Sequence, residues 1–252
     1  MALQTISISF NPAAVKGELE SFSGWINEML RKHPWLREHL CGHVDIMRSN
    51  LVGEDSLTID EYKFLMSDKG PNLALDVHLM EKFERVYPQR VLEPYIENRS
   101  PKMRSLAIHA EATQKSGVDG MNEVKSMLDH IRRADLRAGV SVDLNSRVTW
   151  QRQGMVQYAD DVLYMSVPAG GSGRAGNLKR ALTRIEKYRG FNPNITIDGG
   201  VKPEILKLLH EAGVNIAVVG NAIFNSPDRE SALLSFVSQM VAQRGERLSD
   251  TL

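Results

Sequence analysis

Short apolar runs rich in β-branched residues alternate along the whole chain with longer stretches of helical periodicity. This alternation constrains the fold most, because neighbouring parallel strands need a helical, right-handed crossover between them. The pattern therefore predicts an α/β fold with a parallel sheet. The strand candidates are Thr5–Phe10, Gly42–Met47, Leu73–Leu79, Ser105–His109, Gly139–Leu144, Asp161–Val167, Asn194–Asp198 and Ile216–Val219.

Eight such units in 252 residues favour a closed (β/α)₈ TIM barrel, with an open doubly wound sheet as the competing architecture. No Pro/Gly/Ser-rich linker divides the chain. We therefore expect one barrel domain over residues 1–252, with a polar tail at about 245–252.

Two helices and one irregular segment can be placed from local signals. Helices are expected at Met121–Arg133, with Asp119 as a candidate N-cap, and at Lys202–Glu211, with Pro203 in the first turn. The segment Arg48–Gly70 shows no clear period, and we expect it to form a loop over the site.

Composition limits the partners and the compartment. Lys plus Arg and Asp plus Glu both total 31, so we expect neither a nucleic acid nor a membrane partner. No apolar run approaches the roughly 20 residues that span a bilayer, and the first residues carry no signal-like basic stretch. The single cysteine, Cys41, excludes an internal disulfide and a Cys-based zinc site. These features predict a cytoplasmic protein.

Residues able to bind a metal stand where predicted strands end. His43 and Asp45 alternate on one face of the second strand, His78 lies near the end of the third, and Asp198 ends the seventh. The carboxyl ends of barrel strands converge on one pocket, so these side chains can meet. A lone His or Asp there is as often an ordinary hydrogen-bonding group. Four together favour a site for one divalent cation, Zn²⁺, Fe²⁺, Mn²⁺ or Co²⁺.

Glycines follow the last three predicted strands, where barrel enzymes usually bind phosphate. Glycine lets backbone N–H groups approach a phosphate closely, although it also serves ordinary flexible loops. The candidates for contact with a phosphorylated small molecule are Gly170, Gly173, Gly199, Gly200, Gly220 and Asn221.

The segments HVDIM, LDVHLM, IHAEA, YMSVPAGGSG, ITIDGGV and VVGNAIF, in this order, resemble the signature segments of the ribulose-phosphate 3-epimerase family. The resemblance runs from about Thr5 to Asn225 and implies a barrel of the ribulose-phosphate-binding type. It also implies a homo-oligomeric, metal-dependent isomerase that converts D-ribulose 5-phosphate into D-xylulose 5-phosphate. Two aspartates would exchange the C3 proton through a metal-stabilised enediolate.

The resemblance assigns roles to individual residues. His43, Asp45, His78 and Asp198 take the metal-ligand positions, and Asp45 and Asp198 also form the acid/base pair. Without the resemblance, methionines are more often core filler than part of a site. Matches to the residues that line the family's reaction centre and contact substrate are Ser9, Met47, Met80 and Met165.

Two loops depart from the family pattern and leave the substrate open. The family continues its second strand as Met-Asp-Gly, whereas here Met47 is followed by Arg48–Glu54. The loop after the sixth strand normally reads Asn-Pro-Gly-Phe-Gly-Gly-Gln, whereas here it is Pro168–Arg174. Arg48 is expected to bring a positive charge near the mouth. A 3-epimerase of another ketose phosphate, such as D-allulose 6-phosphate, is therefore a serious alternative.

Two further functions are disfavoured. A non-catalytic sugar-phosphate-binding protein would have lost an acid/base residue, and both aspartates are present. Related decarboxylases carry Asp-x-Lys-x-x-Asp on the third strand, whereas this chain has no lysine in the stretch from Asp76 to Glu81. His109 and Glu111 are groups that orient a metal ligand or ordinary strand-end hydrogen bonders, and the second interpretation is favoured.

Overall fold

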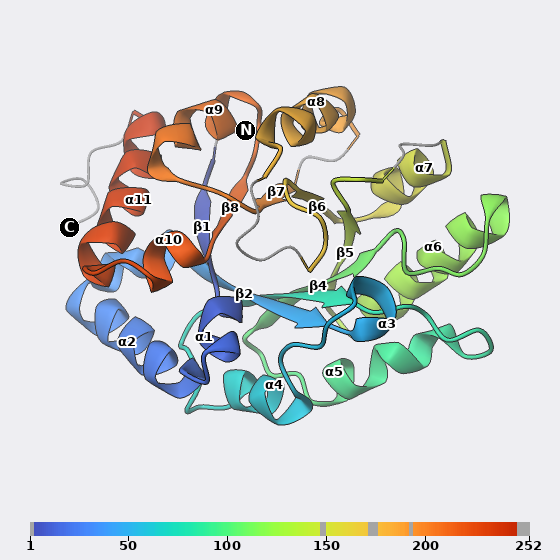
Figure 1. Ribbon diagram of the computed structural model, residues 1–252, viewed down its shortest axis with the longest axis horizontal. Helices are drawn as coiled ribbons and strands as arrows, with labels where there is room; N and C mark the ends of the chain where they lie inside the picture. Colours follow the sequence, from blue (N-terminus) through green and yellow to red (C-terminus); the bar gives the residue numbers. More distant parts are fainter. Residues whose placement is uncertain (1–2, 147–149, 171–175, 192–193, 246–252) are drawn as a thin grey trace.

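The predicted strands close into a barrel. In the computed structural model, eight parallel strands pair in chain order, and β1 pairs with β8 to complete the circle (Figure 1). This closure confirms the TIM barrel and excludes the open sheet. The structure describes residues 3–146, 150–170, 176–191 and 194–245. The strands are β1 (Thr5–Ser9), β2 (Leu40–Met47), β3 (Leu75–Met80), β4 (Met103–His109), β5 (Arg137–Val142), β6 (Asp161–Met165), β7 (Ile195–Asp198) and β8 (Ile216–Val219).

Helices follow the strands and surround the barrel (Figure 1). No described helix is long and apolar enough to cross a membrane. The α-helices are α1 (Asn11–Val15), α2 (Leu19–Lys32), α3 (Ser49–Val52), α4 (Ile59–Met66), α5 (Glu93–Glu97), α6 (Gly117–Arg133), α7 (Trp150–Tyr158), α8 (Leu178–Tyr188), α9 (Leu206–Glu211), α10 (Asn221–Phe224) and α11 (Arg229–Gln243). The 3₁₀ helices are η1 (Pro34–Glu38), η2 (Pro88–Val91) and η3 (Pro203–Ile205).

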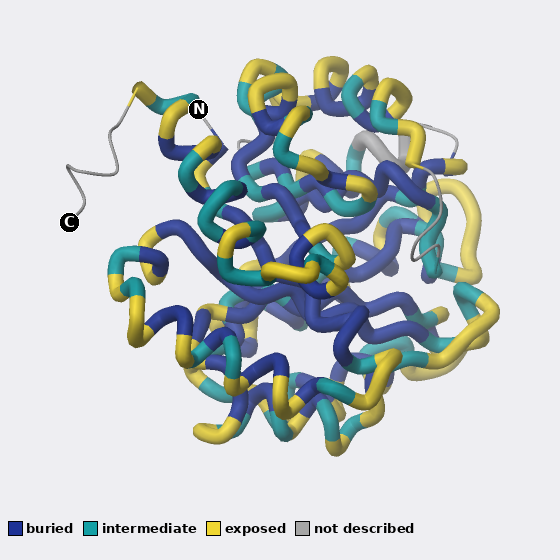
Figure 2. Tube along the Cα trace, turned by 60° about the vertical axis from the view of Figure 1, so that its left-hand side comes forward, coloured by how far each residue is buried: buried dark blue, intermediate teal, exposed yellow. Residues whose placement is uncertain are grey.

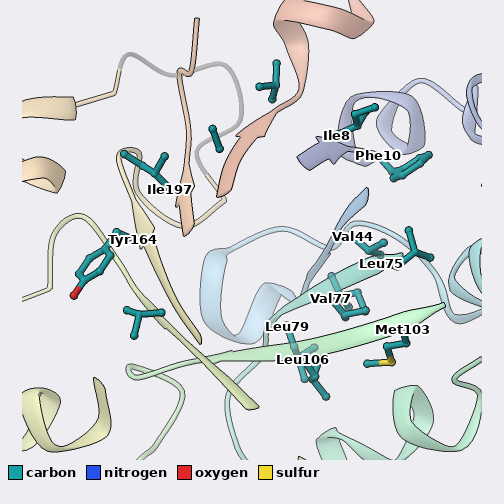
Figure 3. Packing of buried hydrophobic residues seen from close by; sticks show 14 of the residues in the cluster. Ile8, Phe10, Val44, Leu75, Val77, Leu79, Met103, Leu106, Tyr164 and Ile197 are labelled. Atoms are coloured by element: carbon teal, nitrogen blue, oxygen red, sulfur yellow. The ribbon is translucent and has the colours of Figure 1, made fainter. Parts of the chain in front are cut away.

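The core occupies the layer between the strands and the helices. Alternate residues of a strand face opposite sides, so the apolar side chains of β2, such as Val44 and Ile46, pack in this layer. Figure 3 shows Val44, Val77 and Leu106 among the buried residues along the barrel wall. Figure 2 shows the strands as a buried centre, with exposed residues on the outer helices and loops. The other residues of β2, which include His43 and Asp45, are thereby left for the interior of the barrel.

The segment Arg48–Gly70 is not the irregular loop that was predicted. It contains α3 and α4, and α4 begins with a capping box. The Thr58 side chain accepts from the backbone N–H of Glu61, and the Glu61 carboxylate accepts from the backbone N–H of Thr58 at 2.7 Å. The spacing Thr-x-x-Glu is itself a sequence signal for a helix start, so this helix was predictable.

Two helix starts also differ from the prediction. Helix α6 begins at Gly117 after the N-cap Ser116, and Asp119 lies in its first turn. The proposed cap at Asp119 is therefore wrong, although a carboxylate in a first turn still favours the helix dipole. The predicted helix Lys202–Glu211 is divided, with 3₁₀ geometry over Pro203–Ile205 and α-helix from Leu206. Of the predicted polar tail, residues 246–252 lie outside the described residues.

Candidate metal centre and active site

Strand register brings the four predicted metal ligands together. Asp45 of β2 stands directly beside His78 of β3, and Asp198 ends β7 opposite Met165 of β6. One ligand atom from each of His43, Asp45, His78 and Asp198 lies within 4.8 Å of the other three. Residues separated by up to 155 positions in the sequence thus form one cluster at the carboxyl ends of the strands.

The donor atoms of this cluster suit a divalent cation. His43 Nε2 and His78 Nδ1 each lie 3.1 Å from the same carboxylate oxygen, Oδ1 of Asp45. Ser9 Oγ donates to the other oxygen, Oδ2, at 3.2 Å. Two imidazole nitrogens and two carboxyl groups form a mixed nitrogen and oxygen set, which transition-series cations accept with room for further oxygen ligands. The residues therefore fit a metal ion of the predicted kind.

The surroundings shift the pKa values of the two aspartates in opposite directions. Burial raises the pKa of Asp45, but His43 and His78 beside it outweigh burial and hold the pKa well below its ordinary value. For Asp198, burial and the charge of Asp45 raise the pKa to about 7, and His43 opposes them only in part. Two nearby carboxyl groups in such different settings can divide the roles of base and acid.

The two histidines differ in charge as well. Burial alone would lower the pKa of His43, but its contact with Asp45 and the nearby charge of Asp198 raise it to about 9. Burial lowers the pKa of His78 to about 4, against the opposing effect of Asp45. His78 is therefore neutral near pH 7, the form in which imidazole binds metals.

The second ring nitrogen of His78, Nε2, also has a hydrogen-bond partner. His78 Nε2 lies 2.9 Å from Nε2 of His109, whose Nδ1 lies 3.3 Å from Oε2 of Glu111. The favoured sequence interpretation, an ordinary strand-end hydrogen-bonding pair, did not include this contact with a ligand of the cluster.

A cavity of about 730 Å³ opens above the cluster. Asp45 and Asp198 line it, together with every predicted substrate-contacting residue within the described ranges. Gly173 lies outside the described residues. The predicted residues that line the cavity are Ser9, Met47, Met80, Met165, Gly170, Gly199, Gly200, Gly220 and Asn221.

Several cavity residues were not predicted from the sequence. Asn11 and Pro12 follow the first strand, and Gly176 belongs to the segment after the sixth. Lys202 is the one cationic residue among the described residues that line the cavity. It comes two positions after Gly200, so its place after a strand end was a usable signal.

Arg48 is not among the described residues that line the cavity. Its guanidinium donates to the backbone oxygens of Met47 at 2.8 Å and Leu57 at 3.3 Å, and to the hydroxyl of Tyr95 at 2.7 Å. The sequence expectation of a positive charge near the mouth stays a prediction, because Met47, whose backbone oxygen accepts from Arg48, itself lines the cavity. These acceptors hold the side chain between the end of β2, the segment before α4, and α5.

Solved structures with similar folds are barrel enzymes. KGPDC from Streptococcus mutans superposes with a TM-score of 0.62 at 13% identity, over 95% of this chain and 98% of that one. 3-Keto-L-gulonate-6-phosphate decarboxylase from Vibrio cholerae O1 biovar El Tor gives a TM-score of 0.64 at 10% identity, over 96% and 99% of the two chains. At these identities the likeness concerns the fold alone.

Sequence relatives are more specific. Ribulose-phosphate 3-epimerase of Synechocystis is 27% identical over 199 residues, which cover 76% of this chain and 78% of the relative. The protein of the same name from Aquifex aeolicus is 26% identical over 79% of this chain and 84% of its own. That from Bacillus subtilis is 27% identical over 77% and 83%.

The family model agrees with these relatives. The model of the ribulose-phosphate 3-epimerase family matches residues 37–224, which is most of the chain and includes all four residues of the His/Asp cluster. The chain belongs to the ribulose-phosphate 3-epimerase family and is an isomerase that acts on carbohydrates.

Proposed function

We propose that this chain is a metal-dependent epimerase that inverts C3 of D-ribulose 5-phosphate to give D-xylulose 5-phosphate. The carrying observation is the convergence of His43, Asp45, His78 and Asp198 within 4.8 Å beneath a cavity bordered by glycines. The names of the relatives support a pentose phosphate as substrate.

The four residues of the cluster would hold one divalent cation. When bound, such a cation supplies Lewis-acid stabilisation of the negative charge that develops on the substrate oxygens. The thioether side chains of Met47, Met80 and Met165 border the same space and offer it an apolar lining. Zn²⁺, Fe²⁺, Mn²⁺ and Co²⁺ all suit these donors.

Asp45 and Asp198 exchange the C3 proton in this proposal. They enter the cavity from β2 and β7, and their pKa values are displaced in opposite directions. One aspartate, as a carboxylate, takes the proton from one face, and the other, protonated, returns a proton to the other face of the enediolate. One turnover leaves the opposite protonation pattern, which serves the reverse reaction.

The phosphate would lie on the glycine side of the cavity, away from the reacting carbon. Gly199 and Gly200 have positive φ angles of 105° and 62°, which a residue with Cβ rarely adopts. Lys202 adds a cation to the same wall. Binding at a distance from C3 helps to hold the reacting carbon in register with the aspartates.

The main alternative is a 3-epimerase of another ketose phosphate, D-allulose 6-phosphate in particular. The loop Arg48–Glu54 still departs from the family pattern. Arg48 lies at the start of this loop, and its guanidinium donates to backbone oxygens and to Tyr95 without lining the cavity. A non-catalytic sugar-phosphate-binding protein is the lesser alternative.

The test is proton exchange at C3, followed by NMR in D₂O with metal-loaded protein. D-ribulose 5-phosphate and D-allulose 6-phosphate are examined in parallel. We expect exchange with inversion on the pentulose phosphate, and loss of both in Asp45→Asn and Asp198→Asn. Faster inversion of the hexulose phosphate would favour the main alternative. Binding of either sugar phosphate without any exchange would favour the non-catalytic alternative.

A further inference from the structure

A chain of hydrogen bonds extends from the cluster into the protein on the far side of His78. The two Nε2 atoms of His78 and His109 lie 2.9 Å apart, and His109 Nδ1 lies 3.3 Å from Oε2 of Glu111. Ser146 Oγ donates to the other oxygen of Glu111. The two imidazole rings stack with centroids 4.9 Å apart and an interplanar angle of 19°, and both side chains are buried.

The chain has a carboxylate at each end, Glu111 and Asp45. With a cation in the cluster, Asp45 and Nδ1 of His78 would both face the cation, and the proton positions then follow from Glu111. The Glu111 carboxylate only accepts hydrogen bonds, so Nδ1 of His109 must donate to it. With one ring proton, placed at Nδ1, His109 presents a lone pair at Nε2 that can accept the Nε2–H of His78. His78 then carries its proton on Nε2 and its lone pair on Nδ1, which lies 3.1 Å from Asp45 Oδ1. Without a cation this carboxylate oxygen, which can only accept, favours the other tautomer.

We propose that His109 and Glu111 are positioning residues that select the His78 tautomer able to bind a metal through Nδ1. This inference rests on the proposed function, because it assumes that the cluster holds a cation. The other tautomer would carry its proton on Nδ1, where the metal must bind. A ligand histidine held through its second nitrogen also keeps a fixed ring orientation.

The surrounding residues keep this relay, the hydrogen-bonded chain of His78, His109, Glu111 and Ser146, in place. His78 and His109 lie on adjacent, paired strands, since His78 faces Ala107 and Leu79 faces Ile108 in the register of β3 and β4. Buried Arg184 of α8 donates to the backbone oxygens of Asp143, at 2.6 Å, and of Ser146. The turn that carries the Ser146 hydroxyl is thereby fixed against Glu111.

The experiment compares zinc binding and histidine tautomers in the full chain. Zn²⁺ affinity is measured by competition with a chelator, and the ring ¹⁵N shifts of His78 are read in the zinc-loaded protein. His109→Phe removes the acceptor, and we expect a loss of zinc affinity of about 10- to 100-fold with a mixture of His78 tautomers. His109→Gln offers an amide oxygen as a substitute acceptor and should restore part of the affinity.

A matched pair of carboxylate variants isolates the end of the relay. Glu111→Gln should weaken zinc binding in the same direction as His109→Phe. Glu123→Gln should leave zinc binding unchanged, because Glu123 is a buried glutamate whose partners are Thr113 and Lys115. Far-ultraviolet circular dichroism checks that each variant is folded.

The outcomes separate this inference from the proposed function. If the wild-type chain binds no zinc through His78, the metal centre of the proposed function fails and the relay fails with it. If the wild type binds zinc but His109→Phe and Glu111→Gln bind it equally well, with His78 in one tautomer, the relay alone is overturned. Weaker binding in both variants, with Glu123→Gln unchanged, supports it.

Discussion

Asp198 binds a proton more tightly in the folded protein than in the unfolded chain, because burial and the charge of Asp45 raise its pKa to about 7. Between about pH 4 and pH 7 the folded state therefore holds more protons than the unfolded state, and stability falls as pH rises. Without a cation, the charged Asp198 is a destabilising group above pH 7. A bound cation would relieve this effect.

We predict that Asp198→Asn stabilises the metal-free protein at pH 8 but not at pH 4. The expected gain at pH 8 is about 1–2 kcal/mol, reduced from the full pKa shift because the side chain is partly exposed to solvent. Urea unfolding in the presence of a chelator at both pH values measures it. An equal gain at both pH values would assign the effect to packing rather than to charge.

The His/Asp cluster was predictable at the level of residues, because its members lie in the middle or at the carboxyl ends of strands, on the side chains that face the barrel interior, and barrel geometry makes these positions converge. The contact of His78 with His109 was not predictable. It depends on side-chain rotamers and on the register of β3 and β4, which shifts between Leu75 and Asp76. The partners of Arg48 were not predictable for a related reason, since a sequence gives its charge but not its hydrogen-bond acceptors.

At the scale of elements, Arg48 joins the end of β2 to the helices beside it. Arg48→Ala removes donors to Met47, Leu57 and Tyr95, so we predict a loss of about 1–3 kcal/mol in the free energy of unfolding. Arg48→Lys should lose nearly as much, since an ammonium cannot replace a planar fork of donors. Urea unfolding compares the three proteins.

The same variants test whether the Arg48 charge acts on the substrate. Interactions between exposed charges weaken as salt is added. If Arg48 acts only within the protein, the dependence of KM on ionic strength should be the same in wild type, Arg48→Ala and Arg48→Lys. If KM depends less on ionic strength in Arg48→Ala alone, the Arg48 charge acts on the substrate at the mouth of the barrel.

The start of α4 offers a separate prediction. Thr58→Ala removes the side-chain acceptor for the Glu61 backbone N–H, and we expect unfolding to become easier by about 1 kcal/mol. Thr183→Ala is the matched control, because this exposed threonine lies within α8, where alanine is the better helix former. A loss of similar size in both variants would remove the capping explanation.

Strands were easier to place than short helices. Each barrel strand carries apolar residues for the outer layer, and this requirement leaves a visible pattern over five or more residues in most of them. Helices such as α3, which has four residues, are too short to show a period of 3.6. Their positions depend on caps and tertiary contacts, so only a cap signal such as Thr58 with Glu61 can reveal them.

At the scale of the whole molecule, closure of the barrel requires β1 and β8 to pair, and the segment after α11 is joined to the residues before β1. Arg244, which follows α11, donates to the backbone oxygen of Leu3 at 3.1 Å and to that of Gln4. The homo-oligomeric state and the cytoplasmic location follow from resemblance and composition, and both stay predictions. Size-exclusion chromatography with light scattering measures the first.

The His/Asp cluster joins β2, β3 and β7, so a cation bound there should stabilise the barrel as a unit. A ligand that binds only the folded state adds about 2.7 kcal/mol at a concentration one hundred times its Kd. For a chain of this length, this corresponds to a rise in Tm of about 5–10 °C. We predict such a rise when Zn²⁺ is added to chelator-treated protein, measured by calorimetry. His78→Ala, which lacks one ligand, should show little of it. An equal rise in both proteins would place the zinc elsewhere, because only a cation held by these strands depends on His78.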